Sequence, residues 1–152
     1  MNQWMQVAYD EAVEGMLAND GGPFGAVIVK DGEIIARAHN RVLQSNDPTA
    51  HAEVNVIRDA SRKLGTFDLA GCEFYASCMP CPMCLGAVFW TSISVVYYGA
   101  TEYDAARAGF DDHRFYERIC GKDHQAFLKQ IDGEETALLF DQWLEKTDRQ
   151  RY

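Results

Sequence analysis

The sequence predicts an α/β protein, a three-layer α/β/α sandwich. Segments with helical periodicity alternate with short runs rich in β-branched residues, in the order α-β-β-α-β-α-β-α along the 152 residues. The first two strand-like runs flank a two-residue turn signal, which predicts a hairpin. The later strands alternate with helices, which predicts parallel pairing. A sheet with helices on both faces follows from this order.

The N-terminal part provides the first helix and the hairpin. Residues 3–18 place Trp4, Ala8, Ala12 and Met16 about four apart, which gives an amphipathic helix with one buried face. The segment NDGGP ends this helix, because Asn and Gly favour the left-handed cap and Pro cannot continue the helix. The hairpin consists of strands at 24–30 and 33–39 around the Asp-Gly turn at 31–32.

The next helix has clear signals at both ends. Asp47 is the predicted N-cap, Pro48 takes the first helical position, and Gly65 is the C-cap. The other predicted elements are a strand at 72–77, a helix from the Pro80–Pro82 segment to about 90, a strand at 92–99, short helices at about 102–108 and 114–119, and a last helix at about 137–149.

Composition limits the class of protein. The length suits one domain over residues 1–152, with 137–152 as a C-terminal helix and tail. The formal net charge of −9 argues against a phosphate backbone as the main partner. We find neither a signal peptide nor the ~18 consecutive apolar residues that a membrane span needs. We therefore expect a soluble, cytoplasmic protein whose five cysteines are thiols or metal ligands.

One motif carries chemistry. Cys81 and Cys84 are three residues apart at a predicted helix start, so both sulfurs can reach one ion. His51 can add a nitrogen ligand, and zinc accepts this mixed set in tetrahedral geometry with water in the fourth position. Glu53, two residues after His51, is then placed to move protons. The pattern H-x-E…P-C-x-x-C is typical of zinc-dependent nucleobase deaminases.

A structural metal is the alternative. A Cys-x-x-Cys pair alone is more often a structural zinc site or a redox pair, and Cys78 could close the coordination sphere as a fourth ligand. Against this, Cys78 follows a strand, and a closed site has no use for Glu53 beside His51. We therefore expect a catalytic zinc held by His51, Cys81 and Cys84, with Cys78, Cys72 and Cys120 as structural residues.

Four segments resemble the cytidine deaminase superfamily and, within it, the bacterial guanine deaminases. They are GGPFGAVIVKDG (21–32), SNDPTAHAEV (45–54), SCMPCPMCLGAVFW (77–90) and DAARAGFDD (104–112). The resemblance implies a cytidine deaminase-like fold with a mixed five-stranded sheet and one zinc ion per chain. It also implies hydrolytic deamination of guanine to xanthine and ammonia, in purine salvage or catabolism. The homodimer that we expect has a C-terminal tail that covers an active site, either of its own chain or of the partner.

The resemblance also implies a substrate site. Asn40 would hydrogen-bond the purine carbonyl and ring nitrogen, and the Ala52 N–H would bind the oxygen on the tetrahedral carbon. Asp112, with Asp111, would accept hydrogen bonds from the guanine amino and ring N–H groups. The other implied contacts are Phe24 against the base, Trp90 at the end of the metal-bearing helix, and the terminal Tyr152. From the residues alone, Phe24 and Trp90 could equally be core residues, and Asn40 and the Asp pair could be loop residues.

One departure bears on the substrate. Met79 stands where the guanine deaminases usually have Glu, and Met can neither bind zinc as a carboxylate nor relay protons. The open alternatives are therefore deamination of guanosine, of cytosine or cytidine, of a triazine such as ammeline, or of adenosine in tRNA. A zinc-stabilised binding module without activity is the non-enzyme alternative, and Glu53 argues against it.

Overall fold

The computed structural model describes residues 1–121, 128, 130 and 133–148. Its packing divides the chain into two units, Met1–His113 and Arg114–Tyr152. The first unit holds α1 (Gln3–Leu17), β1 (Gly25–Lys30), β2 (Glu33–His39), α2 (Val42–Ser45), α3 (Ala52–Leu64), β3 (Glu73–Cys78), α4 (Pro82–Phe89), β4 (Val96–Ala100) and α5 (Glu102–Arg107).

The sheet is mixed, as predicted, but it has four strands in the described part of the chain, in the order β2-β1-β3-β4. β1 is antiparallel to β2 and β3, whereas β3 and β4 are parallel. The expected fifth strand is therefore a wrong prediction for these residues. The reason is local: Thr101 and Asp104 form a capping box directly after β4, so the chain enters α5 instead of returning as a strand.

The predicted hairpin is confirmed. Asp31 and Gly32 both have positive φ, 52° and 78°, as a two-residue turn of the primed type requires. The turn leads Lys30 back opposite Glu33, and the far end of the hairpin pairs Gly25 with His39. Since β1 also runs antiparallel to β3, the start of β1 lies beside the C-terminal ends of β2 and β3.

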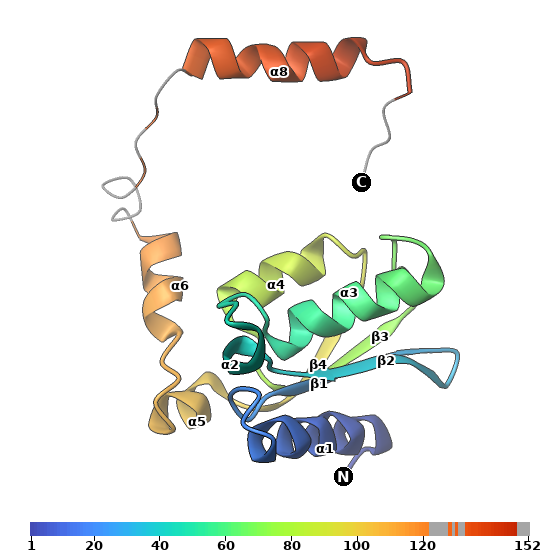
Figure 1. The fold of residues 1–152 in the computed structure, drawn as a ribbon, viewed down its shortest axis with the longest axis vertical. Coiled ribbons are helices and arrows are strands. Elements are labelled where there is room, and N and C mark those ends of the chain that lie inside the picture. The colour runs from blue at the N-terminus through green and yellow to red at the C-terminus, as the bar shows by residue number, and fades with distance from the viewer. Residues whose placement is uncertain (122–127, 129, 131–132, 149–152) are drawn as a thin grey trace. The chain divides into compact units, whose positions relative to one another are not determined.

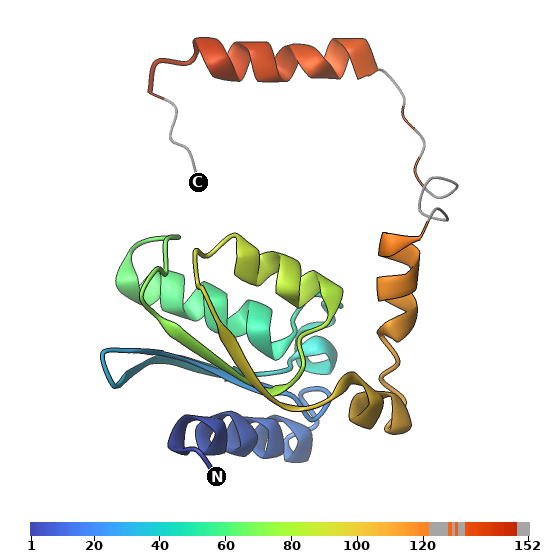
Figure 2. The same ribbon diagram turned by 180° about the vertical axis from the view of Figure 1, so that it is seen from behind.

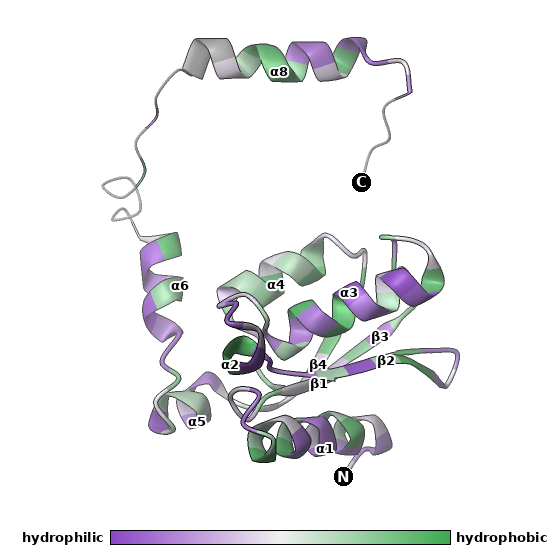
Figure 3. Ribbon diagram, viewed as in Figure 1, coloured by the Kyte–Doolittle hydropathy of each residue, from purple (hydrophilic) through white to green (hydrophobic). Residues whose placement is uncertain are grey.

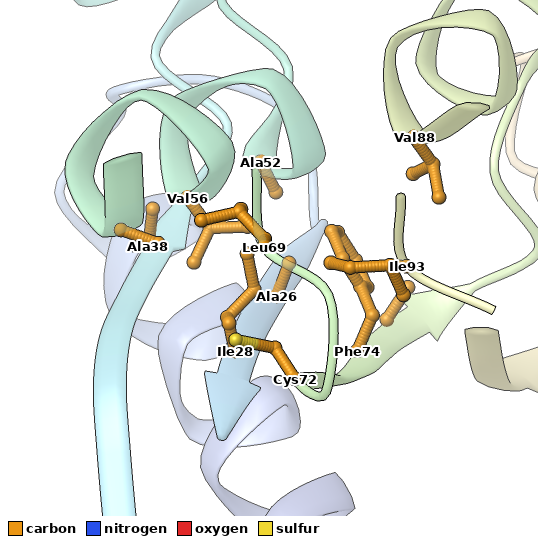
Figure 4. Close-up of a cluster of buried hydrophobic side chains, with 12 residues drawn as sticks. Ala26, Ile28, Ala38, Ala52, Val56, Leu69, Cys72, Phe74, Val88 and Ile93 are labelled. Atoms are coloured by element: carbon orange, nitrogen blue, oxygen red, sulfur yellow. The ribbon is translucent and has the colours of Figure 1, made fainter. Parts of the chain in front are cut away.

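The three layers are α1, the sheet, and α3 with α4 on the opposite face (Figures 1 and 2). Successive residues of β1 point to opposite faces: Ala26 and Ile28 belong to the core under α3, and Val27 and Val29 to the core under α1. Figure 4 shows the first core with Phe74 and Leu69 among its fully buried side chains. The central strand is thus buried on both faces, which explains its continuous apolar run.

Helix boundaries differ from the predictions at one functional position. α3 begins at Ala52 with His51 as its N-cap, not at Pro48. Asp47 instead accepts hydrogen bonds from the Thr49 N–H and hydroxyl, and so stabilises a separate turn. The Gly65 C-cap is confirmed, with φ 68°. α3 mixes hydrophobic and hydrophilic residues along its length, as an amphipathic surface helix requires (Figure 3).

The unit Arg114–Tyr152 carries most of α6 (His113–Cys120) and all of α8 (Gly133–Glu145). Five large apolar side chains of α8 are exposed, and these are Leu138, Leu139, Phe140, Trp143 and Leu144. No helix within the described residues has both the length and the apolar character needed to cross a membrane.

Candidate metal centre and substrate site

Two helix starts carry the metal motif. His51 is the N-cap of α3 and Cys81 is the N-cap of α4, and neither side chain caps its own helix. Both side chains are therefore free to turn toward a common point. Cys84 lies one turn into α4, on the same face as Cys81. The geometry of α4 thus fixes the position of the two sulfurs relative to each other. The packing of α3 beside α4 brings the His51 imidazole to them.

The donor atoms fit a zinc ion. His51 Nδ1 lies 3.7 Å from Cys81 Sγ and 3.5 Å from Cys84 Sγ, and all three atoms lie within 4.8 Å of one another. Zinc–sulfur bonds of about 2.3 Å and zinc–nitrogen bonds of about 2.0 Å at tetrahedral angles place sulfur and nitrogen about 3.5 Å apart. The two thiols and one imidazole are also the ligand types that zinc prefers.

The electrostatics of the cluster favour a cation. Hydrogen bonding from Cys84, and then from His51, lowers the pKa of Cys81 to about 4. The pKa of Cys84 is raised, first by its hydrogen bond to Cys81 and second by burial. The two sulfurs therefore share a proton. The hydrogen bond to Cys81 also raises the pKa of His51. A bound metal would replace these protons, because thiolates and neutral imidazole are the ligating forms.

Glu53 is buried next to the cluster without belonging to it. Its Oε2 lies 3.4 Å from Cys84 Sγ. Burial raises the pKa of Glu53, which brings its carboxyl group closer to accepting and releasing protons near neutral pH. Because α3 places Glu53 in its first turn and His51 at its N-cap, the carboxyl group stays close to the metal ligands.

Cys78 has a different environment. Its Sγ donates to the Thr101 carbonyl oxygen over 3.5 Å, and it is not in the cluster of His51, Cys81 and Cys84. Burial raises the pKa of Cys78 to about 11, so it remains a neutral thiol. Met79 is half-buried, and its N–H donates to the carbonyl oxygen of Ala100 at the end of β4.

Asn40 is buried at the end of β2, and its amide orientation is fixed. Its Oδ1 accepts hydrogen bonds from the N–H groups of Gly22, at 3.3 Å, and Val42, at 3.1 Å. Two donors use the capacity of an amide oxygen, so the Nδ2 hydrogens are what remains for a ligand. The sequence predicts that the Asn40 amide offers a ligand both a donor and an acceptor. In the structure only the donor remains available.

Asp112 carries an oxygen that needs a partner. Its Oδ1 is the one buried side-chain nitrogen or oxygen without a hydrogen bond in the described residues of the chain. Burial raises the pKa of Asp112, and the negative charge of Cys81 raises it further. Asp111, by contrast, is exposed.

The loop before Asp112 is anchored on Phe24. The rings of Phe24 and Phe110 meet edge to face with centroids 5.0 Å apart. Gly22 allows this packing, since a Cβ there would lie 2.9 to 3.0 Å from both rings. Phe24 also packs against the core under α3, which confirms the core role among the two that the sequence allowed.

The remaining predicted residues are dispersed. Ala52 is the first residue of α3, so its N–H has no acceptor within the helix and stands beside the metal ligands. Trp90 is the C-cap of α4 and is 67% exposed, at the opposite end of the helix from Cys81. Within one chain it therefore lies away from the cluster. Tyr152 lies outside the described residues.

Sequence reasoning missed Asn55 and Phe110. The Asn55 amide donates to the carbonyl oxygens of His39, at 3.0 Å, and Ala50, at 3.1 Å. It thereby ties the segment before Asn40 to the residue before His51. A polar residue on the buried face of α3 was the available signal for Asn55. For Phe110, the signal was an apolar residue next to the Asp pair.

The fold and the cluster define a class of protein. The family model for the cytidine and deoxycytidylate deaminase zinc-binding region matches residues 1–100, which include both helix starts. The chain belongs to this family of hydrolytic deaminases, and zinc is the metal that the family and the donor set indicate.

Within that class, guanine deaminase of Bacillus subtilis (strain 168) is 58% identical over 108 residues, which are 71% of this chain and 69% of that protein. An X-ray structure of guanine deaminase from Bacillus subtilis matches with a TM-score of 0.93 and 46% identity, covering 100% of this chain and 99% of the other. The tRNA-specific adenosine deaminase of Aquifex aeolicus (strain VF5) is 49% identical over 80 residues, 53% of each protein.

Proposed function

We propose that this protein is a zinc-dependent aminohydrolase that converts guanine to xanthine and ammonia. The observation that carries the proposal is the convergence of His51, Cys81 and Cys84 beside the buried carboxyl group of Glu53. The similarity to a guanine deaminase along the length of the chain supports guanine as the substrate.

His51, Cys81 and Cys84 would hold one zinc ion per chain, which leaves a fourth position open. A zinc ion in such a site makes water a good nucleophile near neutral pH. Glu53 would take a proton from the attacking water and deliver protons to the ring nitrogen and to the leaving amine. The Ala52 N–H would donate to the oxygen that develops charge on the attacked carbon.

Asn40 would donate hydrogen bonds to the base, and Asp112 would accept hydrogen bonds from it. The Asn40 amide has only N–H groups to offer, so it suits the acceptor atoms of the purine. The unpartnered Oδ1 of Asp112 suits the amino and ring N–H donors of guanine. A site built to accept those bonds rejects bases that lack them, because its buried acceptor would then stay unpaired. Phe24 would lie against the flat face of the base.

A substrate panel scored for ammonia release tests the proposal. We expect guanine to be preferred over guanosine, adenine, cytosine, cytidine, ammeline and a tRNA anticodon stem-loop. Asp112→Ala should lower kcat/KM for guanine at least about tenfold. Asp111→Ala is the matched control, since Asp111 is exposed, and it should change little. Faster turnover of another substrate, or an unchanged rate for Asp112→Ala, would overturn the assignment.

The assembly belongs to the same proposal. We expect one deaminase domain over 1–152 that forms a homodimer, with the helix and tail over 137–152 covering an active site of the same or the partner chain. The exposed apolar residues of α8, such as Phe140 and Trp143, support a partner surface for that helix. The five unpaired cysteines support a reducing location, the cytoplasm.

A further inference from the structure

His39, the last residue of β2, lies between two carboxylates. Its Nδ1 is 3.1 Å from Glu11 Oε2 on α1, and its Nε2 is 3.0 Å from Asp20 Oδ2 in the loop after α1. Both ring nitrogens therefore lie within hydrogen-bonding distance of a carboxylate oxygen. Arg37 also reaches Glu11, through Nε at 3.1 Å. The imidazole therefore links the strand to the helix on one side and to the loop on the other.

The contacts around the ring are close and leave little freedom. A Cβ at Gly15 of α1 would lie 2.5 Å from the imidazole, so the helix approaches the ring as closely as glycine allows. Glu11 is buried, and the side chains of His39 and Asp20 are 13% and 17% exposed. Shielding from water strengthens such charge-assisted hydrogen bonds.

The loop that contains Asp20 also contacts Asn40. The Asp20 carbonyl oxygen accepts the N–H groups of Leu43 and Gln44, and so attaches the loop to α2. Two residues later, the Gly22 N–H donates to Asn40 Oδ1. Gly21 passes so close that a Cβ there would lie 2.0 Å from the same oxygen. The loop fixed by His39 is thus the loop that orients the Asn40 amide.

We propose that His39 is a positioning residue for substrate binding: by holding Asp20 through Nε2, it seats the 20–22 loop that orients the Asn40 amide toward the base. The inference rests on the proposed function, because it concerns Asn40 as a residue that binds the purine. His39 itself does not contact the base; it acts through Asp20, Gly22 and Asn40.

The consequence is a separation of KM from kcat. In the proposed function Asn40 binds an edge of the base that does not react, so a misplaced amide would weaken the binding of substrate and transition state together and raise KM. His51, Cys81, Cys84 and Glu53 lie on other elements, so zinc content and kcat should be largely kept. A merely structural role for His39 would instead lower the amount of folded enzyme and leave KM unchanged.

Two isosteric variants separate the two sides of the ring. His39→Gln places a donor near Nε2 and keeps the bond to Asp20, whereas His39→Asn places one near Nδ1 and keeps only the bond to Glu11. We expect His39→Asn to raise KM for guanine about tenfold with kcat within about threefold, and His39→Gln to keep KM within about threefold. The reverse order, or equal KM values, would overturn the proposal.

A second pair covers the case in which the His39 variants fold poorly. Asp20→Asn keeps an oxygen that can accept from Nε2, and Asp20→Ala removes it. Asp20→Ala should raise KM about tenfold, and Asp20→Asn should stay within about threefold of the parent. An unchanged KM in Asp20→Ala would reject the role of the loop.

Amide hydrogen exchange tests the same link without any substrate. In the zinc-loaded protein, His39→Asn or Asp20→Ala should speed exchange at Gly22 and Val42, the two donors to Asn40, and leave Phe74 in the central sheet unchanged. Unchanged exchange at Gly22 would contradict the inference. If the parent enzyme fails to deaminate guanine, the proposed function fails, and this measurement still decides the role of His39.

Discussion

Glu53 and Asp112 are two carboxylates near one metal cluster whose partners differ. Glu53 is buried and contacts the Cys84 sulfur, whereas Asp112 has one buried oxygen with no partner among the described residues. Burial raises the pKa of both groups. The difference in partners suits different tasks, proton transfer for Glu53 and hydrogen bonding to a ligand for Asp112.

Glu53→Gln tests the proton-transfer role. The amide keeps the size of the side chain but cannot exchange protons, so we expect turnover to fall about 10²- to 10⁴-fold while zinc content and Tm stay near those of the parent. Glu33→Gln, at an exposed end of the hairpin, is the matched control and should keep full activity. Residual turnover above about a tenth of the parent would rule out this role for Glu53.

Cys78 and Cys81 are three residues apart but should behave differently toward zinc. Cys78→Ser keeps a donor to the Thr101 carbonyl and should leave about one zinc per chain, whereas Cys81→Ser removes a ligand and should lose the metal. Metal analysis of the purified variants gives the answer. Zinc loss in Cys78→Ser would mean a closed, structural site with four protein ligands.

At the scale of elements, the site is assembled by the starts of α3 and α4. Each start places a metal ligand at the N-cap, and the packing of both helices on the sheet sets the distance between the ligands. Val56 is a fully buried residue of α3 in the core that supports this packing. The stability of the core and the geometry of the cluster are therefore connected.

Val56→Ala measures this connection. The smaller side chain leaves a cavity between α3 and the sheet, so we expect the free energy of unfolding to drop by about 2 kcal/mol. Val95→Ala is the matched control, because Val95 is 41% exposed, and it should change stability by less than about 0.5 kcal/mol. Denaturant unfolding of the zinc-loaded proteins compares the two. Equal losses would contradict the burial on which the prediction rests.

At the scale of the whole molecule, the metal cluster lies in the unit Met1–His113, and α8 with its exposed apolar residues lies in the unit Arg114–Tyr152. Deamination benefits from enclosure of the base, because water weakens the electrostatic interactions that stabilise the reacting centre. A helix that carries exposed apolar side chains, such as Phe140 and Trp143 of α8, is suited to this task.

Deletion of residues 147–152 tests the C-terminal tail. We expect turnover to fall at least about tenfold, because the reacting base would be open to water, and the mass in solution to shift toward the monomer. Light scattering and ammonia release measure both. Tyr152→Phe, which keeps the aromatic ring and removes only the hydroxyl group, is the milder control. A dimer with full activity after the deletion would show that the tail does not cover the site.

The sequence by itself determined the features that depend on local geometry. The spacing of Cys81 and Cys84 follows from one helical turn, the Asp31–Gly32 turn from positive φ, and the Gly65 cap from the left-handed conformation. The tertiary structure decided the rest. His51 meets Cys81 across 30 residues of sequence only because α3 and α4 pack together. The Asn40 oxygen accepts a hydrogen bond from Gly22 only because the loop with Gly21 and Gly22 packs directly against Asn40. Such long-range contacts form when strands pair and helices pack, and no short stretch of sequence encodes them.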